Sequence, residues 1–218
     1  MGTITRSFAN NIGTSGILKA AAFNNASLNN VTALNAAVAL GNMILISSQT
    51  ASDSASISFT TGIDSTYKEY QFWFIDIHPR TDAVDFTFNM STDSGSNYNV
   101  TKTSTSFRTL HSESGASTDL SYNTNFDLAQ STAVQSLIAG GIANDADGSV
   151  GGILTLFNPA STTYVKHFIS LFNAYRSTDG TQSCHVAGYG NTTSAINAIQ
   201  FSMESGNFDG TILMFGIK

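Results

Sequence analysis

From Met43 to the end of the chain, short runs of residues alternate between apolar and polar side chains, which is the two-residue period of a β-strand. Residues 54–60, 84–90 and 196–204 each place their apolar side chains on one side, as strands with one solvated face do. Turn-forming residues separate the runs at intervals of about 8 to 15 residues, a spacing typical of sandwiches and not of βαβ units. The sequence therefore predicts an all-β domain over residues 43–218, a jelly-roll-like antiparallel sandwich.

The chain ends on a run that is apolar on both faces. Ile212 and Met214 lie on one side of an extended chain, whereas Leu213, Phe215 and Ile217 lie on the other. We therefore expect this strand to be buried in the middle of a sheet or sandwiched against a neighbour.

Three other runs, residues 67–77, 152–158 and 164–175, are also apolar on both faces. A loop, the N-terminal segment or another subunit must cover the second face of these strands, and self-association is the simplest of the three. We therefore expect a homo-oligomer, and a trimer in particular, because a face of several large apolar side chains is costly to leave in water. The side chains expected to pack between subunits are Phe72, Trp73, Phe74, Phe168 and Phe172.

Residues 1–42 differ from the rest in having no Asp or Glu and only two cations, Arg6 and Lys19. We interpret them as an extended N-terminal arm with a short helix near residues 28–40, where Ser27 serves as N-cap. The arm is expected to attach the domain to a larger particle through Ile4, Phe8, Ile12, Ile17 and Phe23. A second short helix is expected as an insertion over residues 125–138, before Gly140 and Gly141.

Composition excludes several classes of partner. Only 11% of residues are charged and the formal net charge is −6, so no basic patch is available to neutralise phosphates, and we expect no nucleic-acid partner. No signal peptide begins the chain and no run is long enough to span a membrane. We expect synthesis in the cytosol and no membrane partner.

The residues that usually carry chemistry are scattered. The four histidines, His78, His111, His167 and His185, lack metal-ligand spacing, and Cys184 lies in an apparent strand as a small buried side chain. We therefore expect no metal, no cofactor and no catalytic residues.

The distribution of the acidic residues also argues against a catalytic site. Asp64, Glu69, Asp76, Asp82 and Asp85 could form a pair of acids, as a glycosidase requires, but most lie at turns or on outward positions. Asp76 stands between two isoleucines and is expected to be buried, with Arg80, Arg108 or Arg176 or backbone donors as its partners. His167 is expected to be a similar polar residue of the core. The residues 144–149 resemble a calcium loop, but their spacing favours an ordinary turn.

The order of several motifs resembles a known family. A Ser-Ile-Ser-Phe strand at residues 56–59 is followed by Tyr67 and Tyr70, by a corner at Pro79, and by a Phe-x-Phe strand that ends in Ser-Thr-Asp-Ser-Gly-Ser at residues 91–96. The chain ends in Gly-Ile-Lys. Over residues 40–218 this order is similar to virion-associated β-sandwich proteins of tailed bacteriophages, of the type found in phages of marine bacteria. The resemblance implies a location in a phage particle.

Arm, sandwich and resemblance together predict a structural component of a tailed-phage virion, either a capsid decoration protein or a tail- or fibre-associated one. Its partners would be other virion proteins of the capsid or tail, and its own copies. The alternative is a module of a tail fibre or spike that attaches to the host by binding a surface glycan through exposed Tyr, Asn and Asp side chains.

Overall fold

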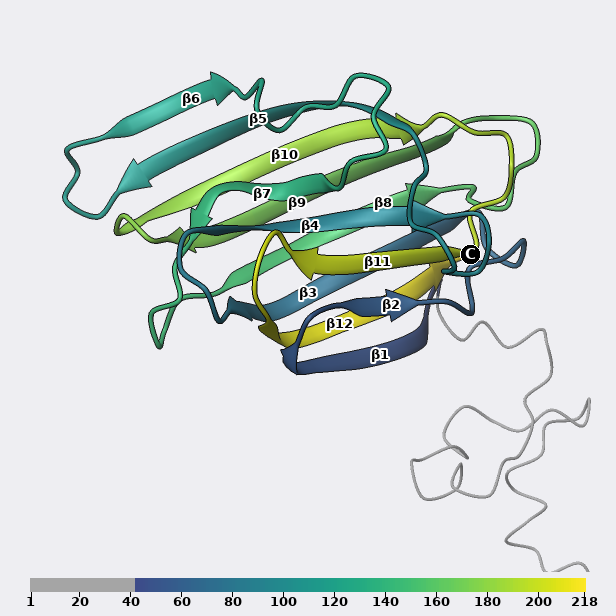
Figure 1. Ribbon diagram of the computed structural model, residues 1–218, viewed down its shortest axis with the longest axis horizontal. Helices are drawn as coiled ribbons and strands as arrows, with labels where there is room; N and C mark the ends of the chain where they lie inside the picture. Colours follow the sequence, from purple (N-terminus) through teal and green to yellow (C-terminus); the bar gives the residue numbers. More distant parts are fainter. Residues whose placement is uncertain (1–41) are drawn as a thin grey trace, which may run out of the picture. The chain divides into compact units, whose positions relative to one another are not determined.

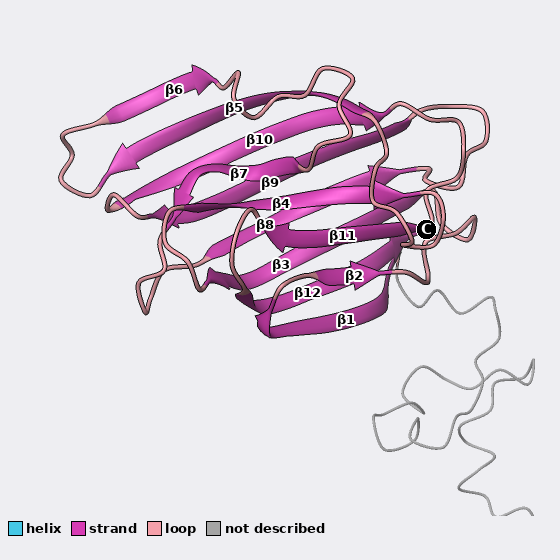
Figure 2. Ribbon diagram, in the orientation of Figure 1, coloured by secondary structure: helices cyan, strands magenta, loops and turns pink. Residues whose placement is uncertain are grey.

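The computed structural model describes residues 42–218, which form twelve β-strands and, in that range, no helix (Figures 1 and 2). The strands are β1 (Met43–Ser54), β2 (Ile57–Phe59), β3 (Glu69–Pro79), β4 (Val84–Ser91), β5 (Lys102–Ser112), β6 (Thr118–Tyr122), β7 (Gln135–Ile142), β8 (Val150–Phe157), β9 (Lys166–Arg176), β10 (Gly180–Gly190), β11 (Ala198–Met203) and β12 (Phe208–Ile217). A helix able to span a membrane is not found among these residues.

All strand pairs are antiparallel, and they make one sheet that folds back over itself. Eight strands follow one another in the order β1-β12-β3-β8-β9-β10-β5-β6, and four more in the order β2-β11-β4-β7. A single pair, Ile142 with Arg176, joins β7 to β9. At the opposite side, the Gln49 side-chain amide of β1 donates to the Ser58 carbonyl of β2, so the folded sheet is nearly closed. Figure 1 shows the four-stranded layer in front of the eight-stranded layer.

Phenylalanines from both layers fill the space between them. Phe74 of β3 lies with its ring centroid 5.5 Å from Phe86 of β4 and 4.9 Å from Phe201 of β11. Nearer the other end, Phe88 of β4 meets Phe168 of β9 at 5.1 Å. These edge-to-face contacts between layers, together with full burial of the rings, make the phenylalanine cluster the centre of the core.

Several sequence-based predictions are confirmed. The described part of the chain is all-β, and β12 lies inside the sheet between β1 and β3. Ile199, Phe201 and Met203 of β11 are buried as expected, and Cys184 is buried in β10.

Two predictions about the strands and their connections are wrong. Residues 125–138 form no helix: they run as a loop that enters β7 at Gln135. The polar side of β4 is not solvated either, because Asp85, Thr87 and Asn89 are buried. The loop before β7 covers this side of β4: the Asn89 side-chain amide donates to the Thr132 carbonyl in that loop. The helix expected near residues 28–40 lies outside the described residues.

Two lysines are buried between the layers, a feature that the sequence pattern did not reveal. Lys102 begins β5 and Lys166 begins β9, and both face inward on either side of Gly190. The Lys102 ammonium donates to Asn89 Oδ1 at 2.6 Å and to the Val100 carbonyl at 2.9 Å. All of these acceptors are neutral, and burial lowers the pKa of Lys102 to about 8.

Candidate functional site

The structure does not assemble the acidic residues into a reaction centre. Within residues 42–218, no group of three or more His, Cys, Asp or Glu side chains could hold a metal ion. Asp85 is buried, but it accepts hydrogen bonds from the Ser136 hydroxyl at 2.9 Å and the Gly140 amide at 3.0 Å, which gives it a structural role. Asp64 accepts from the Thr66 amide in the loop before β3, and Glu69 begins β3. Asp82 lies in the β3–β4 turn.

Asp76 is exposed, contrary to the prediction of a buried carboxylate. It lies in a bulge of β3, where its φ is 52° and the register with both β8 and β12 shifts. The bulge turns the side chain outward and interrupts the strict alternation that the prediction assumed. None of its expected partners reaches it: Arg80 pairs with Asp209, Arg108 lies 3.9 Å from Asp119, and Arg176 donates to the Gly140 carbonyl.

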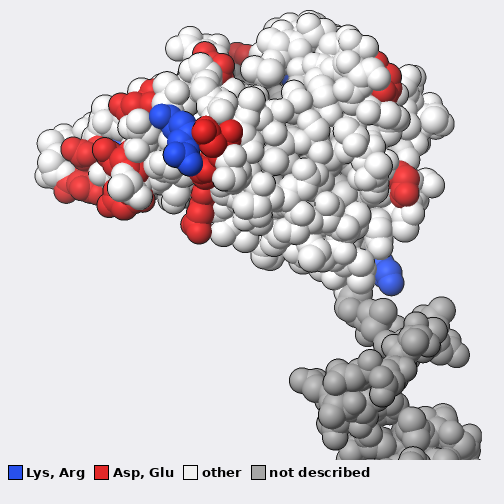
Figure 3. Space-filling view, turned by 60° about the horizontal axis from the view of Figure 1, so that its bottom comes forward, with Lys and Arg blue, Asp and Glu red and all other residues white. Residues whose placement is uncertain are grey.

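Most exposed carboxylates gather at one end of the domain. On the surface in Figure 3 the acidic side chains crowd this end, and much of the remaining surface carries no charge. The end of β1 contributes Asp53, and the loops contribute Asp82, Glu113, Asp145, Asp147, Asp179 and Glu204. We call it the acidic end.

The residues expected to pack between subunits fall on both sides of the eight-stranded layer. Phe72, Phe74, Phe168 and Phe172 point into the core of the chain itself, where β4 and β11 cover them, so their predicted contact with another subunit is wrong. Only Trp73 points the other way. The arm residues Ile4, Phe8, Ile12, Ile17 and Phe23 lie outside the described residues.

The side of the eight-stranded layer that faces away from the core carries a continuous line of side chains, which we call the central row. It crosses all eight strands through directly paired residues. Ile153, Leu171 and Phe107 in this row are exposed to 39%, 57% and 45%. The row consists of Ser48, Leu213, Trp73, Ile153, Leu171, His185, Phe107 and Tyr122.

Two flanking rows complete this surface, which we call the outer face. One contains Leu45, Phe215, Gln71, Thr155, Ile169, Ala187 and Thr105. The other contains Thr50, Thr211 and Ile75 on one side, and Gly151, Asn173, Ser183, Thr109 and Leu120 on the other. No Lys, Arg, Asp or Glu occupies any of the three rows. The exposed apolar side chains of the central row, within a face that carries no charge, mark a site of interaction.

Hydrogen bonds along β3 fix the indole of Trp73 on the outer face. The indole N–H donates to Gln71 Oε1 at 3.2 Å, and the Gln71 amide donates to Glu69 Oε1 at 2.8 Å. Phe215 packs beside the indole with a centroid distance of 5.3 Å. Because the N–H has an acceptor within the strand, Trp73 and Phe215 form an ordered aromatic pair on the surface.

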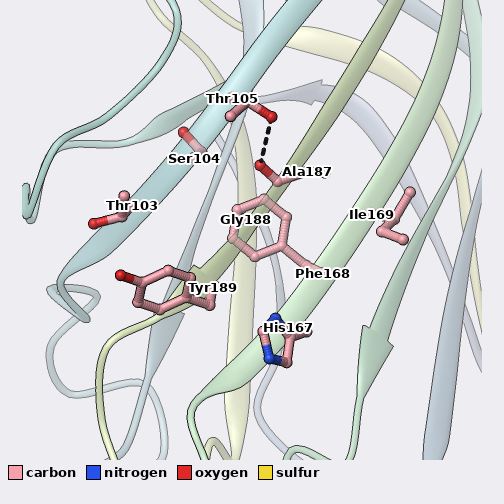
Figure 4. A pocket seen from close by; sticks show the side chains of 9 residues that line it. All are labelled: Thr103, Ser104, Thr105, His167, Phe168, Ile169, Ala187, Gly188 and Tyr189. Carbon is pink, nitrogen blue, oxygen red and sulfur yellow. Dashed lines mark hydrogen bonds between the residues drawn. The ribbon is translucent and has the colours of Figure 1, made fainter.

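A shallow hollow opens on the same face across β5, β10 and β9 (Figure 4). Its volume is about 400 Å³, and it is bordered by Tyr189, His167, Thr103, Thr105 and Ile169, with Ala187 and Gly188 between them. The small side chain of Ala187, between Ile169 and Thr105, leaves the space open. His167 therefore faces outward, and its predicted place in the core is wrong.

The fold and this surface define an all-β protein whose two layers enclose an aromatic core. The larger layer presents an outer face without Lys, Arg, Asp or Glu in its three rows, and the central row of this face is mainly apolar. No protein-family model, no curated protein and no solved structure matches the chain.

Sequence reasoning found the strands of the outer face, but of the five side chains that it chose only Trp73 lies on that face. The signal was present: Ile153, Ile169 and Leu171 lie on the same face as Trp73, and Ile169 and Leu171 alternate with the chosen Phe168 and Phe172. Which side faced the core could not be decided without knowing that β4 and β11 cover β3 and β9.

Proposed function

We propose that the protein is a structural component of a tailed-phage virion, in the capsid or the tail, that assembles with copies of itself through the outer face. The observation that carries the assembly role is the apolar central row, which includes no charged residue across eight paired strands. The motif order of residues 40–218 supports the location in a virion. A jelly-roll-like fold belongs to the same proposal, because two antiparallel layers around one core are a property of jelly rolls.

Under this proposal the protein performs no catalytic step and uses no metal. Residues 1–42 attach the domain to the particle, and the β domain forms the contacts between neighbouring copies. The low charge suits this role, since uncharged surfaces of identical copies do not repel one another.

The direct test is to purify particles of the phage that encodes the protein and to measure its copies per particle by quantitative mass spectrometry. We expect it in intact particles at a fixed ratio to the major capsid or tail protein. A variant without residues 1–42 should remain folded and be lost from the particles. Absence of the full-length protein from washed particles would refute the virion role.

A second function, binding of a host-surface glycan, is favoured by one observation. Tyr189, Thr103 and Thr105 border the hollow and offer an aromatic surface beside hydroxyl groups, the combination that sugars require. A glycan array with the wild type and Tyr189→Ala separates the two functions. Specific binding that the substitution abolishes would favour the attachment module.

A further inference from the structure

We propose that the outer face is a two-fold symmetric interface, on which a second copy of this chain packs face to face about an axis that runs along the strands between β8 and β9. The inference rests on the proposed function in one respect, since it names the copy-to-copy contact that the virion role requires.

The centre of the outer face fits such an axis. Four strands lie on each side of the boundary between β8 and β9, and the central row crosses this boundary from Ile153 to Leu171. Rotation about the axis reverses the strand order, so Ile153 meets Leu171 of the second copy, and Leu171 meets Ile153. These two exposed aliphatic side chains would form the buried middle of the interface.

The two sides of the face are complementary to each other under the same rotation. The aromatic pair of Trp73 and Phe215 lies on β3 and β12, the second and third strands from the axis on one side. The hollow spans β9, β10 and β5, the first three strands on the other side. The rotation keeps each residue's position along the strands, so it places Phe215 of each copy over Thr105 at the border of the other copy's hollow, and Trp73 over His185 beside it. An isologous interface repeats this contact twice.

Size and charge agree with a second copy as the occupant. Eight strands about 4.8 Å apart and three rows about 6.7 Å apart give roughly 750 Å² for each copy. Stable protein–protein interfaces bury about 800 Å² per partner. An acidic or basic partner would gain nothing from three rows without charge, whereas a second copy matches them.

The test measures the association of the full-length protein by sedimentation velocity. We expect the wild type to form a dimer, or an even-numbered oligomer, at micromolar concentration. Leu171→Lys places a charge at the axis and should weaken pairing roughly a hundredfold or more. Ala187→Tyr adds no charge but fills the hollow and should weaken pairing at least about tenfold. The matched control is Tyr164→Lys, because Tyr164 is more exposed than Leu171 but lies in the β8–β9 loop.

Cysteine cross-linking tests the position of the axis. The chain has one native cysteine, which is buried, so Leu171→Cys introduces a single accessible thiol. Facing sheets lie about 10 Å apart, too far for a direct disulfide, so the thiols are joined with a short bismaleimide, which should link Leu171→Cys into covalent dimers and leave Tyr164→Cys unlinked. Circular dichroism and melting temperature confirm that each variant is folded.

The outcomes separate the two proposals. A monomeric wild type, or an oligomer that survives both Leu171→Lys and Ala187→Tyr, would overturn the symmetric interface and leave the virion role to the particle analysis. A dimer that these folded variants dissociate, from a protein absent from particles, would support the interface and refute the virion role.

Discussion

Burial of the Lys102 ammonium between the two layers should make the stability of the domain depend on pH in a specific direction. The side chain is 0% exposed and its three-donor head group contacts neutral oxygens, so its charge is favoured less than in water. Its pKa falls from 10.5 to about 8. At 1.36 kcal/mol per pKa unit, the buried charge opposes folding by about 3 kcal/mol near neutral pH.

The sign of the effect follows from which state binds the proton. Below pH 8, Lys102 is charged in both the folded and the unfolded chain, so its full cost is present. Between about pH 8 and 10.5 the unfolded chain keeps a proton that the folded chain has released, so this residue makes stability rise with pH. Tyr175 acts in the opposite direction above pH 10, because the hydrogen bond to Asp179 raises its pKa to about 12.

A comparison with Lys102→Met isolates the lysine, since Tyr175 and Lys166 contribute equally to both proteins. Urea unfolding at pH 7, 8, 9 and 10 gives the free energy of unfolding of each. The wild-type value minus the variant value should rise by about 2.5 kcal/mol between pH 7 and pH 10. The Val100 carbonyl loses a donor in the variant, but this loss shifts the difference equally at every pH.

Lys68→Met is the matched control, because Lys68 is exposed and should show no such trend. Parallel pH profiles for the wild type and Lys102→Met would refute the reasoning. They would mean that water reaches the ammonium or that the side chain leaves the core.

Two further predictions concern packing and association. Gly152→Val should lower the free energy of unfolding by about 1–3 kcal/mol in urea titrations, because the ring of Phe172 occupies the place of a Cβ. Gly151→Val should be nearly neutral, because a Cβ there meets only the Phe74 carbonyl oxygen, at an ordinary contact distance of 3.8 Å. The proposed dimer places the acidic ends of two copies side by side, so sedimentation should show tighter pairing as salt is raised from low concentration to about 0.15 M, where the Debye length is about 8 Å; weaker pairing with added salt would contradict that orientation.

Strand positions followed from the sequence because alternation is a local property. The final strand shows this most clearly: its two apolar faces required neighbours, and β12 has β1 and β3 beside it. The expected helix over residues 125–138 failed because Leu128, Val134, Leu137 and Ile138 fit a helical spacing as well as they fit a loop that leads into a strand. A short apolar pattern does not distinguish these cases.

Burial of polar residues could not be predicted in the same way, because it depends on contacts between distant segments. Asn89 alternates with phenylalanines and so resembled a solvated residue of a one-sided strand. In the fold it accepts from Lys102 and donates to Thr132, and both of these contacts come from residues outside its own strand. The prediction of the side chains that pack between subunits was wrong at Phe72 for a related reason. Whether Phe72 or Trp73 is exposed depends on which face of β3 is covered by β11.

The fold itself does not require the outer face to be free of charge. Thr105, Thr109, Thr155 and Ser183 stand on paired strands with their side chains away from the core, and a Lys or Glu at such positions changes stability by only about 0.5 kcal/mol. Exposed sheets commonly use such residues to remain soluble and to discourage sheet-to-sheet association. Here most of the exposed acids lie at one end of the domain, and two of the cations are inside the core. Charge was available to the chain and is absent from the one surface where it would prevent a second copy from packing.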